Sequence, residues 1–181
     1  MNSNFNRYAL QSPLHIGALR GMYLGVWLSI MFMLTMLGDQ LPLASLLFLL
    51  MALAIPVLVY RWLRSTFVTD GGFTTLSGLW MQGIVMFGGG ALVSTTVAVA
   101  YFRWVNPHYV IDMVIRMIEI YKDSSMDGAA RIATTLQSMV DAGMLPTAQD
   151  VALEMFWLTM FGGSVLSLFA SLVARARRVS G

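Results

Sequence analysis

The hydrophobic positions of this chain fall into long runs that are apolar on every side of a helix. The runs cover residues 17–37, 43–60, 79–102 and 151–173. A bilayer core about 30 Å thick is crossed by about 20 helical residues, so each run is long enough to span a membrane. The first run is longer than the core of a signal peptide and has no small-residue cleavage site before Gly38, so we expect it to remain as a span.

The connections between these runs differ in length and polarity. Gly38–Pro42 is short, which predicts that the first two spans form a helical hairpin. Residues 61–78 are predicted as a loop of medium length, and residues 103–150 as a long polar segment. The pattern therefore predicts an all-α, polytopic membrane protein with four transmembrane helices, forming a single membrane domain over residues 1–181.

The long segment between the third and fourth spans has a helical periodicity of its own. Asn106 can cap a helix and Pro107 suits its first turn, and apolar and charged residues then recur on opposite faces. Ser124 or Ser125 can cap a second amphipathic stretch. We therefore expect two short amphipathic helices in this segment.

Two further signals mark the end of the segment. Gly143 suits the C-terminal stop of the second helix. The sequence "TAQD", Thr147–Asp150, matches a capping box, in which two side chains satisfy each other's backbone N–H groups. The fourth span is therefore expected to begin at this box.

The composition agrees with a membrane protein. Hydrophobic residues make up 57% of the chain and charged residues only 11%, whereas soluble domains carry about 25% charged residues. The net charge of +2 is too small to indicate a nucleic-acid partner. Cysteine is absent, so disulfides, cysteine metal sites and thiol chemistry are excluded.

Positive charge is unevenly divided between the two sides that the spans define. One side carries seven arginines, Arg7, Arg20, Arg61, Arg64, Arg175, Arg177 and Arg178. The other carries four cations, Arg103, Arg116, Lys122 and Arg131. Because cytoplasmic loops are enriched in Arg and Lys, we expect a bacterial inner-membrane protein with both termini cytoplasmic and residues 103–150 in the periplasm.

Glycines in the spans are the main packing signal. Those predicted to pack helices together are Gly17, Gly21, Gly25, Gly88, Gly89, Gly90, Gly162 and Gly163. Small residues at a spacing of four let membrane helices approach closely. The alternatives are a hinge in the third span, or a groove for a lipid chain or for the helix of another protein. Pro56 would add a kink to the second span.

Catalytic chemistry has little support in the sequence. The middle of every span lacks ionisable residues, which argues against a proton-coupled transporter. His108, Asp112 and Glu119 form either a metal or acid–base site or a solvated helix face, and the second reading is favoured because such spacing is common. Since no hydrolase, metalloprotease or phosphate-loop motif occurs, we expect no enzyme activity, no metal and no cofactor.

The predicted loop after the second span combines arginines, aromatic residues and glycines. Its candidate residues for docking a partner are Arg61, Trp62, Arg64, Phe67 and Phe73. The aromatic side chains can instead bury at the membrane interface, with the arginines near anionic headgroups.

Several motifs together resemble one known family. They are "YRWLRSTF", "GGFTTLSGLWMQG", "RWVNPHYVIDMVIRM" and "MFGGSVLSLFASLV". The chain from about Leu19 to Arg178 resembles a bacteroidete family of four-span membrane proteins, domain of unknown function four-one-nine-nine, although its outward loop has fewer charges. Members tend to be encoded beside a polyprenyl-phosphate type glycosyltransferase. The resemblance thus implies such an enzyme as a partner and an accessory role in envelope-glycan synthesis.

Three classes of function are compatible with these observations. The favoured one is a non-enzymatic accessory or assembly subunit that contacts membrane lipids and another membrane or membrane-associated protein, or forms a homo-oligomer. The second is a small transporter or flippase for a lipid-linked or apolar substrate, based on Gly88–Gly90, Pro56 and the polar residues Gln82 and Ser94–Thr96. The third is an enzyme that uses His108, Asp112 or Glu119 of the outward segment.

Overall fold

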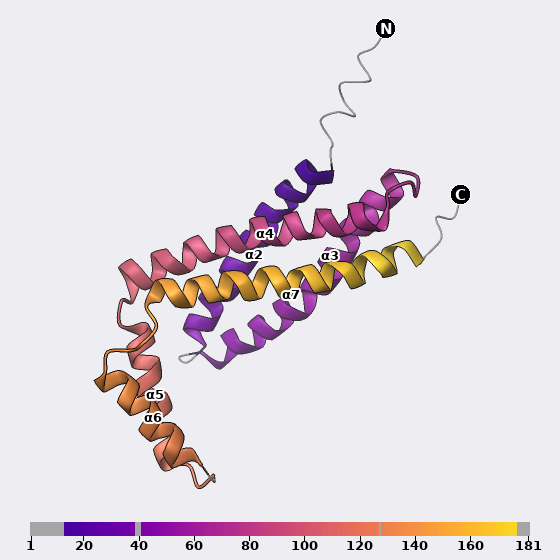
Figure 1. Ribbon diagram of the computed structural model, residues 1–181. Helices are drawn as coiled ribbons and strands as arrows, with labels where there is room; N and C mark the ends of the chain where they lie inside the picture. The colour runs from indigo at the N-terminus through magenta and orange to yellow at the C-terminus, as the bar shows by residue number, and fades with distance from the viewer. Residues whose placement is uncertain (1–12, 39–40, 127, 177–181) are drawn as a thin grey trace. The chain divides into compact units, whose positions relative to one another are not determined.

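The computed structural model describes residues 13–38, 41–126 and 128–176, and these residues form helices and no strand. The elements are α2 (Pro13–Leu37), α3 (Pro42–Thr69), α4 (Leu76–Ala100), a π-helical turn (Tyr101–Val105), α5 (Tyr109–Asp123), α6 (Ala129–Asp141) and α7 (Ala148–Ala176) (Figure 1). Four helices, α2, α3, α4 with its π-helical turn, and α7, are long and apolar enough to cross a membrane. The prediction of an all-α protein with four spans is therefore confirmed.

The chain divides into two compact units. The first contains the residues up to Thr96 and those from Met155 onward, so it holds α2, α3, most of α4 and most of α7. The second, Val97–Glu154, holds α5 and α6 together with the adjoining ends of α4 and α7. We call them the membrane unit and the hairpin unit.

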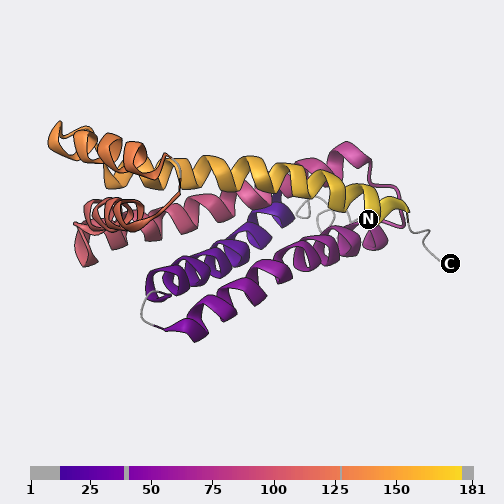
Figure 2. The same ribbon diagram turned by 90° about the horizontal axis from the view of Figure 1, so that it is seen from below.

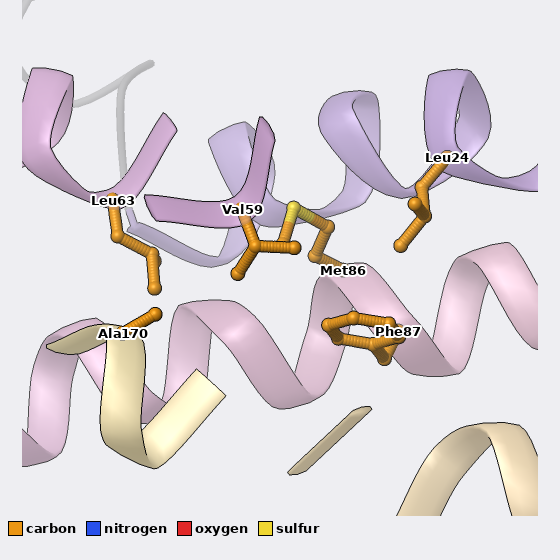
Figure 3. Packing of buried hydrophobic residues seen from close by; sticks show 6 residues of the cluster. All are labelled: Leu24, Val59, Leu63, Met86, Phe87 and Ala170. Atoms are coloured by element: carbon orange, nitrogen blue, oxygen red, sulfur yellow. The ribbon is translucent and has the colours of Figure 1, made fainter. Parts of the chain in front are cut away.

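The membrane unit is built from two pairs of helices. α2 and α3 form a hairpin, and α4 and α7 lie side by side and run in opposite directions in both views (Figures 1 and 2). All four helices contribute to one apolar core. Its buried members are Leu24, Val59, Leu63, Met86, Phe87 and Ala170 (Figure 3).

α3 is longer than the hydropathy pattern predicted. Residues 61–69 were expected to belong to a loop, but they continue the helix. Leu63, Thr66 and Phe67 stay buried at helical spacing, so one face of this segment still packs although its other side is polar. The helix ends where the N–H of Gly72 donates to the carbonyl of Phe67 at 2.9 Å, a bond typical of a glycine stop. The loop before α4 is therefore shorter than predicted.

The hairpin unit contains the two amphipathic helices expected from the sequence. α5 and α6 pack against each other through Ile118, Ala129 and Ala133, which are all buried. The alanines are small, so the two helices can approach closely. Most other apolar side chains of the two helices remain exposed.

Both helices begin later than predicted. α5 begins after Pro107, because the N–H of Asn106 still donates to the carbonyl of Tyr101 at 3.0 Å in the preceding π-helical turn. α6 begins after Gly128 and not after residues 124–125. Gly128 has a φ of 89°, a left-handed conformation that glycine adopts without strain and that reverses the chain before α6.

The predicted capping box opens α7. Thr147 Oγ1 accepts from the N–H of Asp150 at 3.2 Å, and Asp150 Oδ2 accepts from the N–H of Thr147 at 2.8 Å. Two N–H groups that the helix cannot satisfy are thus bonded by side chains. The box fixes the point at which the chain leaves the hairpin and enters its last span.

The predicted glycine stop closes α6, and it carries a testable consequence. Gly143 has a φ of 64°, and its N–H donates to the carbonyl of Val140 at 3.0 Å. We expect Gly143→Ala to destabilise the hairpin by about 1 kcal/mol, the cost of a Cβ in this conformation. Hydrogen exchange of the α6 amides measures the effect. Gly162→Ala, at an ordinary helical position, is the control and should cost nothing.

Candidate functional site

A buried hydrogen-bonded cluster joins three helices of the membrane unit. Arg20 on α2 donates from Nη1 to the carbonyl of Trp62 at 2.5 Å and to Thr66 Oγ1 at 2.8 Å, both on α3. Gln82 on α4 donates from Nε2 to the same Thr66 Oγ1 at 3.1 Å. The hydroxyl of Thr66 can itself donate to the carbonyl of Trp62 at 3.3 Å. We call these four residues the polar hub.

The hub uses the full bonding capacity of one hydroxyl group. A threonine hydroxyl has one donor and two acceptor positions, and Thr66 uses all of them. Thr66 and Gln82 are buried, at 7% and 1% exposure, so water cannot replace these bonds at little cost. Arg20, counted above only among the arginines of the cytoplasmic side, is committed to bonds between helices. The hub thus fixes how α2, α3 and α4 lie against one another.

Two buried side-chain atoms near the centre of the membrane unit have no hydrogen-bond partner among the described residues. They are Gln82 Oε1 and Ser167 Oγ. Ser167 lies on α7 directly against Gly83, where a Cβ would overlap it. Buried polar atoms are rarely left unpaired, so these two mark the least satisfied positions in the bundle.

A second arginine ties α3 to α7. Arg64 donates from Nη1 to the carbonyl of Ala174 at 2.7 Å. Its guanidinium also lies over the ring of Phe67, 5.6 Å from the ring centre, and Phe67 is buried. Arg64 and Phe67 were both candidates for docking a partner. Their contacts within the membrane unit remove the ring of Phe67 from any exposed docking surface.

The other candidate docking residues also differ in how far they are exposed. Trp62 is half-buried against the apolar core, and its carbonyl belongs to the polar hub. Arg61 is exposed, and Phe73 is 90% exposed in the loop between α3 and α4. Only Arg61 and Phe73 therefore keep their side chains fully on the surface.

Glycines bring α2 and α4 into close contact. A Cβ on Gly21 would lie 2.8 Å from the carbonyl oxygen of Met86, and one on Gly25 would lie 2.5 Å from Val93 Cβ. Both distances are shorter than two non-bonded atoms can approach, so these positions require glycine. The other predicted packing glycines at this contact are Gly17, Gly89 and Gly90, each of which faces the partner helix.

α4 and α7 are held together by a second set of small residues. A Cβ on Gly163 would overlap the ring of Phe87. Gly83 provides the equivalent close contact with Ser167. Gly83 was not among the glycines predicted to pack helices together, although a small residue within a span was a usable signal.

The remaining two predicted packing glycines do not contact another described helix. A Cβ on Gly88 of α4 or on Gly162 of α7 would meet no atom within 4 Å in the part of the chain that the structure describes. Each has a large exposed neighbour one helical turn away. Leu92 is 61% exposed and Leu158 is 77% exposed. Both glycines therefore form small notches on the outside of the bundle.

The candidate metal or acid–base residues of the hairpin unit lie on its surface. His108, Asp112 and Glu119 are all exposed. Within residues 13–38, 41–126 and 128–176, no three His, Cys, Asp or Glu side chains come close enough to hold a metal ion. Three acidic or imidazole ligands on one helix face would also need a fourth group from another element.

The comparison with known proteins identifies a family for this chain. The profile of a family described as "Protein of unknown function (DUF4199)" matches residues 17–176. No curated protein and no solved structure matches the chain. The matched region includes most of α2, all of α3 to α6 and all of α7. The chain therefore belongs to the DUF4199 family.

Proposed function

We propose that this integral membrane protein is a non-enzymatic accessory or assembly subunit whose spans bind another membrane protein side by side. The observation that carries the proposal is the position of Gly88 and Gly162, two glycines within spans that no described helix covers. Membrane helices associate through small residues, because these let two backbones come close. Each glycine therefore supplies a place where a helix of a partner can seat.

The residues beside these glycines give each notch its shape. Leu92 follows Gly88 by four residues and Leu158 precedes Gly162 by four, so each lies on the same helical face as its glycine. Both leucines are well exposed. A notch beside a large side chain supports interdigitation with a second helix, since van der Waals packing is the main attraction between helices in lipid.

The features that favoured a transporter are used within the protein itself. Ser94 donates to the carbonyl of Ala91 at 3.2 Å and Thr96 to that of Leu92 at 2.8 Å, so both bond to their own helix. Gly90 packs against α2, and Pro56 lies inside α3 without ending it. These groups support helix packing more than substrate handling, which makes the accessory role the better supported of the two.

The setting that we propose is the inner membrane of a bacterium, with both termini cytoplasmic and residues 103–150 periplasmic. The support is the excess of arginine at one end of the spans, which includes Arg20, Arg61, Arg64 and Arg175. The resemblance described above suggests a polyprenyl-phosphate type glycosyltransferase as the partner. Membrane lipids cover the remaining apolar faces.

The test is co-purification from native membranes. Tagged wild-type chain, Gly88→Leu and Gly162→Leu are extracted in mild detergent, and the proteins retained are identified by mass spectrometry. We expect the wild type to retain a membrane protein in stoichiometric amount. Each variant should retain about tenfold less, which corresponds to about 1.4 kcal/mol of binding free energy.

Val57→Leu is the control, because it adds bulk at a position of α3 that is 56% exposed, on a helix that carries neither notch. It should retain the partner as the wild type does. A wild-type chain that purifies alone, or variants that keep the partner, would contradict the proposal. Recovery of only a second copy of the chain would replace the accessory role with a homo-oligomer.

A further inference from the structure

The α5–α6 hairpin has one strongly apolar face. Residues three or four apart on a helix share a face, which places Met113, Met117 and Ile120 together on α5. Ile132 and Met139, seven apart, likewise share a face of α6. In an antiparallel pair these two flanks lie on the same side of the hairpin. All five side chains are between 36% and 67% exposed, and we call them the apolar face.

The other side of the hairpin is polar on α6 and mixed on α5, where Ile111 and Ile115 are 42% and 43% exposed. A groove there is lined by alanines and by Lys122, Thr134, Gln137, Ser138 and Asp141. Gln137 donates from Nε2 to Asp141 Oδ1 at 3.1 Å, and such a polar pair is stable in contact with water. The side with Met113, Met117, Ile120, Ile132 and Met139 is therefore the more continuously apolar of the two, because both helices contribute apolar side chains to it.

Both ends of the hairpin are tied closely to membrane spans. Residues 106–108 separate the π-helical turn from α5, and residues 142–147 separate α6 from α7. At about 3.5 Å per extended residue, these links reach about 10 Å and about 20 Å. The open end of the hairpin is therefore held near the bilayer surface at which the spans emerge.

Exposed apolar groups occur next to the open end of the hairpin. Trp104 and Val105 of the π-helical turn and Met144 of the second link are 76%, 69% and 70% exposed. Tryptophan favours the interface between lipid tails and headgroups. The residues beside the hairpin are therefore of a type that suits the membrane interface.

We propose that the apolar face binds the surface of the lipid bilayer, so that the α5–α6 hairpin lies flat on the leaflet from which α4 emerges. The occupant is lipid and not a protein, because the short links keep the bilayer permanently beside the hairpin at a high effective concentration. An amphipathic helix binds in this way when its apolar side enters the headgroup region by about 5–10 Å. Arg116, three residues after Met113 and four before Ile120, borders this face, and a cation there favours anionic headgroups.

This inference is independent of the proposed function, since it concerns the hairpin and not Gly88 or Gly162. The absence of cysteine makes a site-specific test simple. The full chain is reconstituted at one copy per nanodisc of phosphatidylethanolamine and phosphatidylglycerol, with a nitroxide label on a single introduced cysteine. Met113→Cys and Met139→Cys report on the apolar face, and Thr134→Cys and Ser138→Cys on the polar side.

We expect the labels at 113 and 139 to show a several-fold higher ratio of collisions with oxygen to collisions with a water-soluble nickel chelate than the labels at 134 and 138. Adding Ile120→Glu should release the hairpin and lower that ratio at 139 to the value at 134, whereas Thr134→Glu, on the polar side, should not. Ile118, Ala129 and Ala133, which hold the hairpin together, remain unchanged in all variants.

Equal access of the nickel chelate to all four labels would overturn the inference, because the apolar face would then be in water. Labels at 113 and 139 that are shielded from both reagents would also overturn it, since that result indicates burial against protein. A ratio at 139 that is insensitive to Ile120→Glu would show that the hairpin is held by something other than its apolar face.

Discussion

Gly163→Val is expected to destabilise the membrane unit by about 3 kcal/mol, near the upper end of the cost of overpacking a core. A Cβ at this position of α7 would overlap the ring of Phe87, which is 4% exposed and belongs to the apolar core. The ring cannot turn away without displacing its neighbours, and α7 cannot move away without losing the contact of Ser167 with Gly83. Loss of the folded peak on size-exclusion after heating measures the effect.

The adjacent glycine provides a matched control. Gly162→Val makes the same chemical change in the same helix, one residue earlier, at a position where a Cβ would meet no described atom within 4 Å. We expect it to change stability by less than about 0.5 kcal/mol. Phe87→Ala added to Gly163→Val should recover part of the loss by making room. Equal losses for Gly162→Val and Gly163→Val would show that both effects come from the helix and not from contact with α4.

The spans were predictable because the length and polarity of a run decide whether it can cross a bilayer. The continuation of α3 through residues 61–69 was not predictable in this way. Hydropathy falls where Arg61 and Arg64 appear, although the helix does not end there. Hydropathy reports the solvent around a helix, whereas helix ends depend on glycine, proline and capping bonds. The closing bond of Gly72 to Phe67 is such a signal, and it lies beyond the apolar run.

The glycines of α7 show a second limit of prediction from the sequence. Gly162 and Gly163 are identical neighbours in the sequence, yet one is uncovered and the other contacts Phe87. Which of them packs depends on the direction from which α4 approaches, and a single sequence does not contain that direction. Spacing therefore predicted that glycines pack the bundle, but it could not separate the contacts within the protein from the notches on its outside.

The polar hub was missed because its members are far apart in the chain. Thr66 lies 46 residues from Arg20 and 16 residues from Gln82. A signal was nevertheless present, since Arg20 and Gln82 stand within apolar spans, where polar groups require partners. The sequence could have shown that the two need partners, but not that one threonine serves both.

Thr66→Val is expected to cost about 2 kcal/mol of stability, although it replaces a hydroxyl with a methyl group of nearly the same size. The change leaves Gln82 Nε2 without a partner and leaves Arg20 with the carbonyl of Trp62 alone. Both are polar groups in a poorly hydrated interior, so the loss is a desolvation cost and not one of shape. Thr69→Val is the control, because Thr69 is exposed and bonds only to Ser65 of its own helix.

The double variant Thr66→Val with Gln82→Leu tests whether the hub acts as a unit. Removing both partners of a buried hydrogen bond leaves neither unpaired, so the double variant should be more stable than the sum of the single effects predicts, by about 1 kcal/mol. Gln82→Leu also removes the unpaired Gln82 Oε1, but that gain is the same in the single and the double variant and cancels in this comparison. Strictly additive effects would mean that Gln82 gains nothing from Thr66. The hub would then tie α2 to α3 through Arg20 but would not tie α4 to either helix.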